Sequence, residues 1–246
     1  PRPLEPWLGG GTRLVWPLQG SHLDLLSEEL AQRVRALIGP RGDHPAAYYN
    51  LSLAGRGGQE AGTSHVAVLG PDGSAVSATS TINTPFGSMV YSPRTGLILN
   101  NQLLDLCWRT RPGARELPDP APGERPPSLM APSILLSREH KAKLVIGGSG
   151  GEMILPATAL AILNNLWLGL DLHAAIEARI LHVRPTLEVL FEPGFEQEVQ
   201  DGLVGRGQRR EEARFWLNVV QAVAQDGRGC IFAESDARKL GEAAGY

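Results

Sequence analysis

Hydroxyl side chains gather at one end of a predicted β-hairpin. Segments 65–69 and 75–81 flank Pro71-Asp72-Gly73, and a three-residue loop with glycine in the left-handed region fixes the register of the two strands. Counting outward from this turn places Thr63 directly opposite Thr81, with their Cβ atoms about 5 Å apart. Two facing hydroxyls at a strand end can serve as a nucleophile and the partner that orients it.

The same register divides the hairpin into two faces. The polar face is expected to carry Thr63, His65, Ser77, Thr79 and Thr81. The buried face is expected to carry Val66, Val68, Val76, Ala78 and Ile82. The alternative to a catalytic site is a solvated sheet face, because threonine is a favoured strand residue. On pattern alone this second interpretation is favoured.

A glycine run, Gly147-Gly148-Ser149-Gly150-Gly151, follows a predicted strand and precedes a predicted helix. It matches the G-x-S-x-G nucleophile elbow, with Asp171 and His182 in the required order, although Asp171 is better used as a helix cap. A second interpretation is an oxyanion hole made of consecutive backbone N–H groups. A third is a flexible turn. A phosphate-binding loop is disfavoured because no Gly-Lys-Ser/Thr follows.

The composition excludes several classes of protein. The 246 residues hold 23 Lys and Arg against 26 Asp and Glu, so no basic field is available for nucleic acid. The densest basic cluster, 206–210, is followed by Glu211 and Glu212 and predicts a solvated, turn-rich surface. Glycine and proline are abundant, yet the hydrophobic fraction of 42% indicates a folded chain. No apolar run approaches the ~20 residues of a membrane span.

No signal peptide opens the chain, which lacks an initiator Met and is expected to be a fragment or a processed piece.

Cys107 and Cys230 are too few for a disulfide framework or a metal site, and no two histidines have metal-ligand spacing. No metal and no cofactor are therefore expected. Arg41-Gly42-Asp43 matches a short adhesion tripeptide, for which a turn is the alternative interpretation. Asn50-Leu51-Ser52 is an N-glycosylation sequon, which counts only if the chain is secreted.

The elements that must position these residues alternate between short strands and helices. A helix is expected from Ser21 to Ile38, where Gly39-Pro40 stops it. Further helices are expected at about 156–168, 172–177 and 194–203, further strands at 97–99, 134–136, 143–146, 186–191, 215–223 and 230–233, and an exposed proline-rich loop at 109–127. Hairpins interleaved with helices predict an α+β layered fold with mostly antiparallel sheet.

Several motifs in register resemble the gamma-glutamyltransferase family. They are Gly62-Thr-Ser-His-Val66, Ser77-Ala-Thr-Ser-Thr-Ile-Asn83, Asn100-Asn-Gln102 with Asp105, the glycine run 147–151 and Gly241-Glu-Ala-Ala-Gly-Tyr246. The match covers the whole small (nucleophile) subunit, residues 63–246. Residues 1–62 are expected to be a remnant of the C-terminal region of the large subunit. The sequence Thr63-Ser-His-Val66 most resembles that of the leukotriene-processing branch of the family.

The resemblance implies an N-terminal-nucleophile hydrolase with an αββα sandwich, expected to be incomplete because most of the large subunit is absent. It implies a precursor that cleaves itself between Gly62 and Thr63. Thr63 would then attack a γ-glutamyl amide, with its freed α-amino group as the base. By the same resemblance, Thr81 would orient the nucleophile, and Gly150 and Gly151 would form the oxyanion hole. The α-amino end of the glutamyl group would be bound by Asn83, Gln102 and Asp105. Its α-carboxylate would be bound by Ser128.

The implied reaction is γ-glutamyl transfer or hydrolysis on glutathione and its S-conjugates, such as leukotriene C4. The implied acceptors are water, an amino acid or a dipeptide, and the implied partner is the large subunit of the same precursor. The implied location is the outer face of the plasma membrane or the secretory pathway. Leu129 departs from the family pattern by replacing the second serine of the carboxylate-binding pair, and Gln102 stands where animal members often have Glu. The rival hypotheses are an inactive truncated fragment or interaction partner, a serine hydrolase that uses Ser149, and a binding module that uses residues 41–43.

Overall fold

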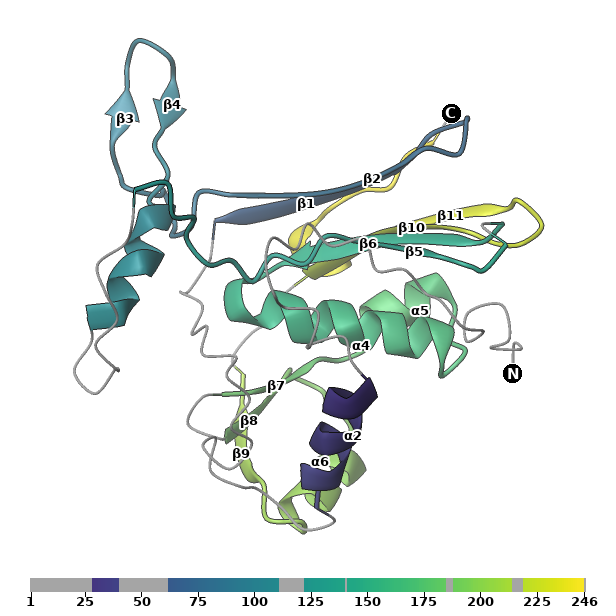
Figure 1. Cartoon of the computed structure of the whole chain (residues 1–246). Helices are drawn as coiled ribbons and strands as arrows, with labels where there is room; N and C mark the ends of the chain where they lie inside the picture. The colour runs from purple at the N-terminus through teal and green to yellow at the C-terminus, as the bar shows by residue number, and fades with distance from the viewer. Residues whose placement is uncertain are drawn as a thin grey trace. The chain divides into compact units, whose positions relative to one another are not determined.

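The computed structural model describes residues 28–39, 62–110, 122–139, 141–184, 188–213 and 219–245, which fall into two compact units (Figure 1). The first unit holds the described residues of 62–178 and 219–245. The second holds those of 28–39 and 179–213. The first predicted helix lies partly outside the described residues and is seen as α2 (Glu28–Leu37). Residues 41–43, Asn50 and the central part of the 109–127 loop also lie outside them.

The first unit contains the predicted hairpins and the helices predicted at about 156–168 and 172–177, arranged in layers. Its elements are β1 (Thr63–Leu69), β2 (Ala75–Thr81), β3 (Tyr91–Ser92), β4 (Leu97–Ile98), the 3-10 helix η2 (Gln102–Thr110), β5 (Ser133–Leu136), β6 (Lys143–Ser149), the 3-10 helix η3 (Gly151–Met153), α4 (Ile154–Leu166), α5 (Leu172–Glu177), β10 (Val219–Gln225), β11 (Ile231–Ser235) and the 3-10 helix η4 (Ala237–Lys239). Arg109 and Thr110 belong to η2, so the predicted loop begins later than expected, where the helical turns end.

A four-stranded antiparallel sheet in the order β11-β10-β6-β5 forms the centre of this unit. Helices α4 and α5 cover one of its faces, and the β1–β2 hairpin packs on the other (Figure 1). Strand β6 is buried along almost its whole length, as expected of a strand covered on both faces. Its apolar run therefore lies at the centre of the core, whose largest buried members are Leu144, Val145, Ile146, Ile154, Val219 and Val220.

Helices α4 and α5 begin where local chemistry predicts. Pro156 lies in the first turn of α4, where a missing N–H leaves no helical hydrogen bond unmade. Asp171 is the N-cap of α5, and its side chain accepts a hydrogen bond of 2.8 Å from the backbone N–H of Ala174. The sequence thus predicted both helices correctly to within two residues.

The register predicted for the β1–β2 hairpin is confirmed residue by residue. Thr63 pairs with Thr81, and His65 pairs with Thr79. Gly73 has a φ of 81°, and the N–H of Gly70 donates to the carbonyl of Ser74 across the turn, at 2.8 Å. A local turn signal therefore fixed a long-range pairing.

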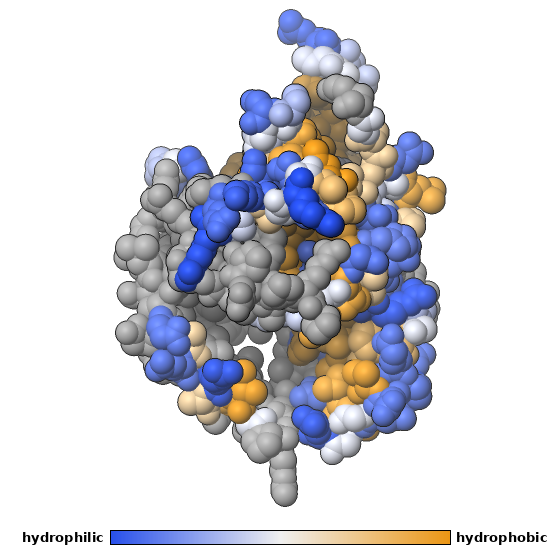
Figure 2. Space-filling view, turned by 90° about the vertical axis from the view of Figure 1, so that its right-hand side faces the viewer, coloured by the Kyte–Doolittle hydropathy of each residue, from blue (hydrophilic) through white to orange (hydrophobic). Residues whose placement is uncertain are grey.

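The predicted assignment of the two hairpin faces is wrong. The polar face turns inward onto the sheet, whereas Val66, Val68 and Val76 are exposed at 53%, 47% and 53%. The hydroxyls of the inward face have partners: the Ser77 hydroxyl donates to the carbonyl of Ile146 at 3.1 Å. The Nε2 of His65 on the same face is buried and has no hydrogen-bond partner among the described residues. Figure 2 shows hydrophobic surface exposed in the upper part of the molecule. An exposed apolar face of this kind is typical of an interaction surface.

A close approach between His65 and Gly147 determines how the hairpin sits on the sheet. A Cβ atom at Gly147 would lie only 2.4 Å from Cε1 of the His65 ring, so the ring occupies the space of a missing side chain. The Nδ1 of His65 and the hydroxyl of Thr79 share a hydrogen bond of 2.8 Å. At the other end of the hairpin, the Lys143 ammonium donates to the carbonyl of Gly73.

The second unit is built on a three-stranded sheet in the order β7-β8-β9. Its elements are α2, β7 (Leu181–Val183), β8 (Glu188–Phe191), α6 (Gln197–Val204) and β9 (Arg209–Glu212). Its core includes Phe191, whose ring meets that of Phe195 edge-on at 5.2 Å. The prediction of a turn-rich surface at the basic cluster is wrong at its end, because residues 209–212 pair in parallel with β8. The Arg209 guanidinium there forms an ion pair with Glu188, with 2.8 Å between Nη1 and Oε1.

None of the helices in the described part of the chain combines the length and apolarity that a bilayer crossing requires.

Replacing Gly147 with alanine is expected to destabilise the first unit by about 1–3 kcal/mol, because the added methyl displaces the His65 ring from its packing and from Thr79. Gly227→Ala is the matched control, since a Cβ there meets no atom within 4 Å. Urea unfolding of both variants measures the difference. Equal unfolding midpoints for the two would contradict the close approach.

His65 is expected to make the stability pH-dependent. Burial lowers the pKa of His65 from 6.5 to about 4, so the folded protein keeps the ring neutral where the unfolded chain protonates it. Protons then favour the unfolded state, and stability falls as the pH drops from about 6.5 towards 4. His65→Asn, neutral at every pH, should flatten this decline in urea midpoints measured from pH 7 to 4.

The exposed His173 provides the control for this measurement. Its pKa is raised by a hydrogen bond to Glu234, so its stabilising charge is already present below pH 6.5 and is lost only as the pH rises. His173→Asn should therefore leave the decline between pH 6 and 4 in place. An unchanged slope in His65→Asn would show that the ring is not buried neutral.

Candidate active site

The two threonines predicted to face each other form a hydrogen-bonded pair at the start of β1. Thr63 is buried, with 2% of its surface exposed, and its hydroxyl donates to Oγ1 of Thr81 at 3.0 Å. The Thr81 hydroxyl also accepts from the backbone N–H of Asn83 at 2.9 Å. Thr81 is thus held from the backbone, and it fixes the rotamer of Thr63 in turn.

The peptide carbonyl that precedes Thr63 is held by two donors. The carbonyl oxygen of Gly62 accepts from the N–H of Ile82 at 3.1 Å and from the Thr81 hydroxyl at 3.3 Å. A side chain at Gly62 would bring its Cβ to 2.8 Å from Cγ1 of Ile82, so glycine is needed for this fit. Donors on a carbonyl oxygen stabilise the negative charge that develops when a nucleophile adds to its carbon. The neighbouring Thr63 hydroxyl is chemically capable of such an addition.

Asn83, Gln102 and Asp105 come together beside the threonine pair. Asn83 is 1% exposed, and its Nδ2 donates to Oδ1 of Asp105 at 3.5 Å and to the carbonyl of Asn101 at 3.3 Å. The side-chain amide of Gln102 donates to the other carboxylate oxygen of Asp105. A buried carboxylate beside two amide groups suits the binding of an ammonium group.

The backbone of Asn83 is strained. Its φ is 72°, a value that residues other than glycine adopt rarely, and strain of this kind concentrates at functional sites. Its side-chain oxygen is buried and has no hydrogen-bond partner among the described residues. The strained turn carries the chain from Thr81 directly into the cluster around Asp105.

The glycine run supplies a second backbone feature near Thr63. Gly150 and Gly151 have φ values of 133° and 64°, which side chains would oppose. Gly150 links the end of β6 to η3, whose first residue is Gly151. The Lys239 ammonium donates to the Thr63 carbonyl at 2.8 Å and to the Ser149 hydroxyl at 3.4 Å. The end of β6, just before the glycine pair, is therefore tied to the same residue as the nucleophile. The oxyanion-hole interpretation of Gly150 and Gly151 stays a prediction.

The nucleophile-elbow interpretation of Ser149 finds no support. Ser149 lies within strand β6, paired with Val219, and not on a strained turn. Asp171 serves as the cap of α5, and His182 lies in β7 of the second unit.

The remaining predicted residues are less closely connected. Ser128 is exposed, and its hydroxyl accepts from the N–H of Met130 at 3.2 Å, but the hydrogen bonds described above do not link it to Thr63. Cys230 is an exposed free thiol. Sequence reasoning missed Lys239, because no short-range pattern relates it to a residue 176 positions earlier.

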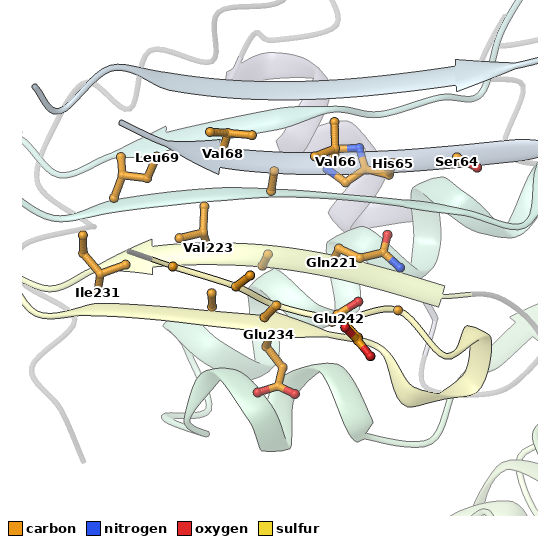
Figure 3. Close-up of a pocket in the computed structure, with 18 of the residues that line it drawn as sticks. Ser64, His65, Val66, Val68, Leu69, Gln221, Val223, Ile231, Glu234 and Glu242 are labelled. Carbon is orange, nitrogen blue, oxygen red and sulfur yellow. The ribbon is translucent and has the colours of Figure 1, made fainter. Parts of the chain in front are cut away.

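A cleft of about 1180 Å³ runs beside the nucleophile strand (Figure 3). It lies along β1, which among the described residues pairs only with β2, and it is bounded by β10, β11 and the C-terminal residues 241–245. Figure 3 shows His65 and Gln221 on the two facing sheets. Ser64, Ser149 and Lys239 line the cleft, whereas Thr63 does not. The cleft is therefore adjacent to the reacting groups and does not contain them.

Comparisons with known proteins agree with this geometry. A family model described as gamma-glutamyltranspeptidase matches residues 17–246. "Glutathione hydrolase 5 proenzyme" of Rattus norvegicus is 57% identical over 231 residues, which are 93% of this chain and 40% of the relative. The human protein of the same name is 55% identical, over 98% of this chain and 44% of the relative. The chain thus spans less than half the length of these relatives.

A solved structure supports the same assignment. The gamma-glutamyltranspeptidase of Pseudomonas nitroreducens, complexed with L-DON, is 28% identical with a TM-score of 0.64, covering 74% of this chain and 97% of that chain. The α, β and β layers of the first unit are three of the four layers of the expected N-terminal-nucleophile hydrolase sandwich. The family model covers most of the chain, and the site has the hydrogen-bonded pair Thr63–Thr81 after Gly62 and the buried carboxylate of Asp105. The chain therefore belongs to the gamma-glutamyltranspeptidase family.

Proposed function

We propose that the protein transfers or hydrolyses the γ-glutamyl group of glutathione and of glutathione S-conjugates, leukotriene C4 among them, through an acyl-enzyme on Thr63. The observation that carries this proposal is the contact of the Thr63 hydroxyl with Thr81, next to a Gly62 carbonyl that two donors hold. The similarity to proteins named glutathione hydrolase supports the substrate class.

The first step is self-cleavage. The Thr63 oxygen adds to the Gly62 carbonyl carbon, and the resulting oxyanion is stabilised by the Ile82 N–H and the Thr81 hydroxyl. The C–N bond then breaks, and the Thr63 nitrogen takes up the proton that the hydroxyl lost. Water hydrolyses the ester that has formed, which leaves a carboxylate on Gly62 and a free α-amine and hydroxyl on Thr63.

The second step uses the groups that cleavage sets free. The α-amine of Thr63 accepts the hydroxyl proton while the oxygen attacks the γ-glutamyl carbonyl carbon. The N–H groups of Gly150 and Gly151 stabilise the oxyanion. The amine of the leaving group departs with the proton. Water, or the amine of an acceptor amino acid or dipeptide, then attacks the ester and regenerates Thr63.

Substrate recognition is assigned to the two ends of the glutamyl group. Asp105, with Asn83 and Gln102, binds the α-ammonium, because a buried carboxylate gains most from a cationic partner. Ser128 binds the α-carboxylate. Leu129 offers no donor at the neighbouring position, so this end is held less firmly than a serine pair would hold it.

The partner proposed for this chain is the large subunit of the same precursor. The exposed Val66, Val68 and Val76 form an apolar sheet face that such a layer would cover, and the relatives are named proenzymes. Residues 1–62 are proposed as the tail of that subunit and 63–246 as the nucleophile subunit. We further propose that the protein lies on the extracellular face of the plasma membrane or in the secretory pathway, and that Asn50 is glycosylated.

Thr63→Ala is expected to abolish both cleavage and activity. Intact mass spectrometry of the wild-type protein should show two pieces, residues 1–62 and 63–246, and the variant should stay whole. Release of the chromophore from a γ-glutamyl anilide should fall at least about a thousandfold, as when other covalent enzymes lose their nucleophile. Ser64→Ala, next to it on the opposite face, is the control. A wild-type protein that stays whole and inactive would favour the inactive-fragment hypothesis.

Asp105→Asn is expected to raise KM for the γ-glutamyl donor about 10- to 100-fold, because it removes the charge that pairs with the α-ammonium. N-acetylation of the donor amine should cost the wild type a similar factor and cost the variant little. Asp201→Asn, an exposed change in the second unit, should alter neither value. If N-acetylation of the donor raised KM of the Asp105→Asn variant as much as that of the wild type, the α-ammonium would not be bound by Asp105.

A further inference from the structure

The segment that follows β11 returns the C-terminal part of the chain to the nucleophile. Lys239, the last residue of η4, donates from its ammonium to the carbonyl oxygen of Thr63 at 2.8 Å and to the Ser149 hydroxyl at 3.4 Å. No other charged side chain described here binds the nucleophile residue directly.

The backbone that presents Lys239 is firmly held. Asp236 is 1% exposed, caps η4, and accepts from the N–H of Val220 in β10 at 3.1 Å. Arg238 pairs with Asp236 at 3.2 Å. The Arg238 guanidinium also donates to three carbonyls at the end of α5, those of Ile176, Glu177 and Ala178. Two other elements, β10 and α5, therefore fix the position from which the lysine side chain extends.

We propose that Lys239 is a positioning residue for the reaction proposed above: it holds the chain end that self-cleavage creates at Thr63 and keeps the new α-amine in its neutral, basic form. Cleavage releases Thr63 from Gly62, and a chain end frays unless it is tied down. The hydrogen bond to the Thr63 carbonyl fixes the backbone on the other side of the α-carbon. The amine then stays beside its own hydroxyl.

The charge of Lys239 acts on the same amine. A positive charge bound to the Thr63 carbonyl disfavours a second positive charge on the nitrogen of that residue. The α-amine, whose ordinary pKa is about 7.7–8.0, is thereby shifted towards the free base that must accept the hydroxyl proton.

Other titratable groups on the neighbouring elements do not replace this charge. His65 on β1 is neutral at pH 7, because burial lowers its pKa to about 4. Asp105 in η2, Glu152 in η3 and Glu242 in the C-terminal segment are acidic, and each would favour a protonated amine. Lys239 is thus the cation that opposes them at Thr63.

The test is the pH profile of kcat/KM, whose acid limb reports the protonation of the base in the free enzyme. Lys239→Gln should move the midpoint of this limb upward by about half to one pH unit, because a neighbouring cation has been removed. Lys239→Arg, which keeps the charge, should restore the wild-type midpoint. Lys141→Gln, which removes an exposed lysine paired with Glu139, should leave it unmoved.

The outcomes separate the role of Lys239 from the proposed function. An active Lys239→Gln protein with an unmoved limb overturns this role alone. Lys239→Gln could stay uncleaved while keeping the wild-type unfolding midpoint. In that case, cleavage of the Lys239→Arg protein supports the holding role of Lys239. If neither variant cleaves, the holding role is overturned. A wild-type protein that neither cleaves nor turns over overturns the proposed function itself.

Discussion

The site depends on the close packing of the His65 ring against Gly147, which is possible because Gly147 has no side chain. It lets the hairpin lie close on β6 with its polar face inward, so that Ser77 reaches the carbonyl of Ile146. The same stacking brings the start of β1 near the end of β6, where Ser149 and Thr63 share one ammonium. Sheet packing places Thr63, and the role proposed for its hydroxyl depends on that placement.

The sequence was sufficient wherever the determining chemistry is local. The turn Pro71-Asp72-Gly73 sets the register that brings Thr81 opposite Thr63, and Asp171 marks the start of α5. The family motifs also identified Asn83, Gln102 and Asp105, which the structure brings together. These features depend on a turn, a cap or a short run of residues, all of which can be seen in a few positions of the chain.

Prediction failed where a distant element decides the outcome. The inward direction of the polar face depends on β6, more than sixty positions away, which supplies both the acceptor for Ser77 and the space for His65. Alternation of residue types shows that two faces exist but cannot say which one is covered. Lys239 and the parallel pairing of residues 209–212 with β8 were missed for the same reason.

The open edge of β1 bears on how the protein behaves in solution. Along that edge the backbone N–H and C=O groups have no strand partner among the described residues, and the exposed valines lie on the same hairpin. A free strand edge beside an apolar surface can pair with a further strand, either from a native partner or from another molecule during aggregation. The hairpin that begins at Thr63 therefore combines an open strand edge with exposed apolar side chains, and covering both would protect it from adding strands of other molecules.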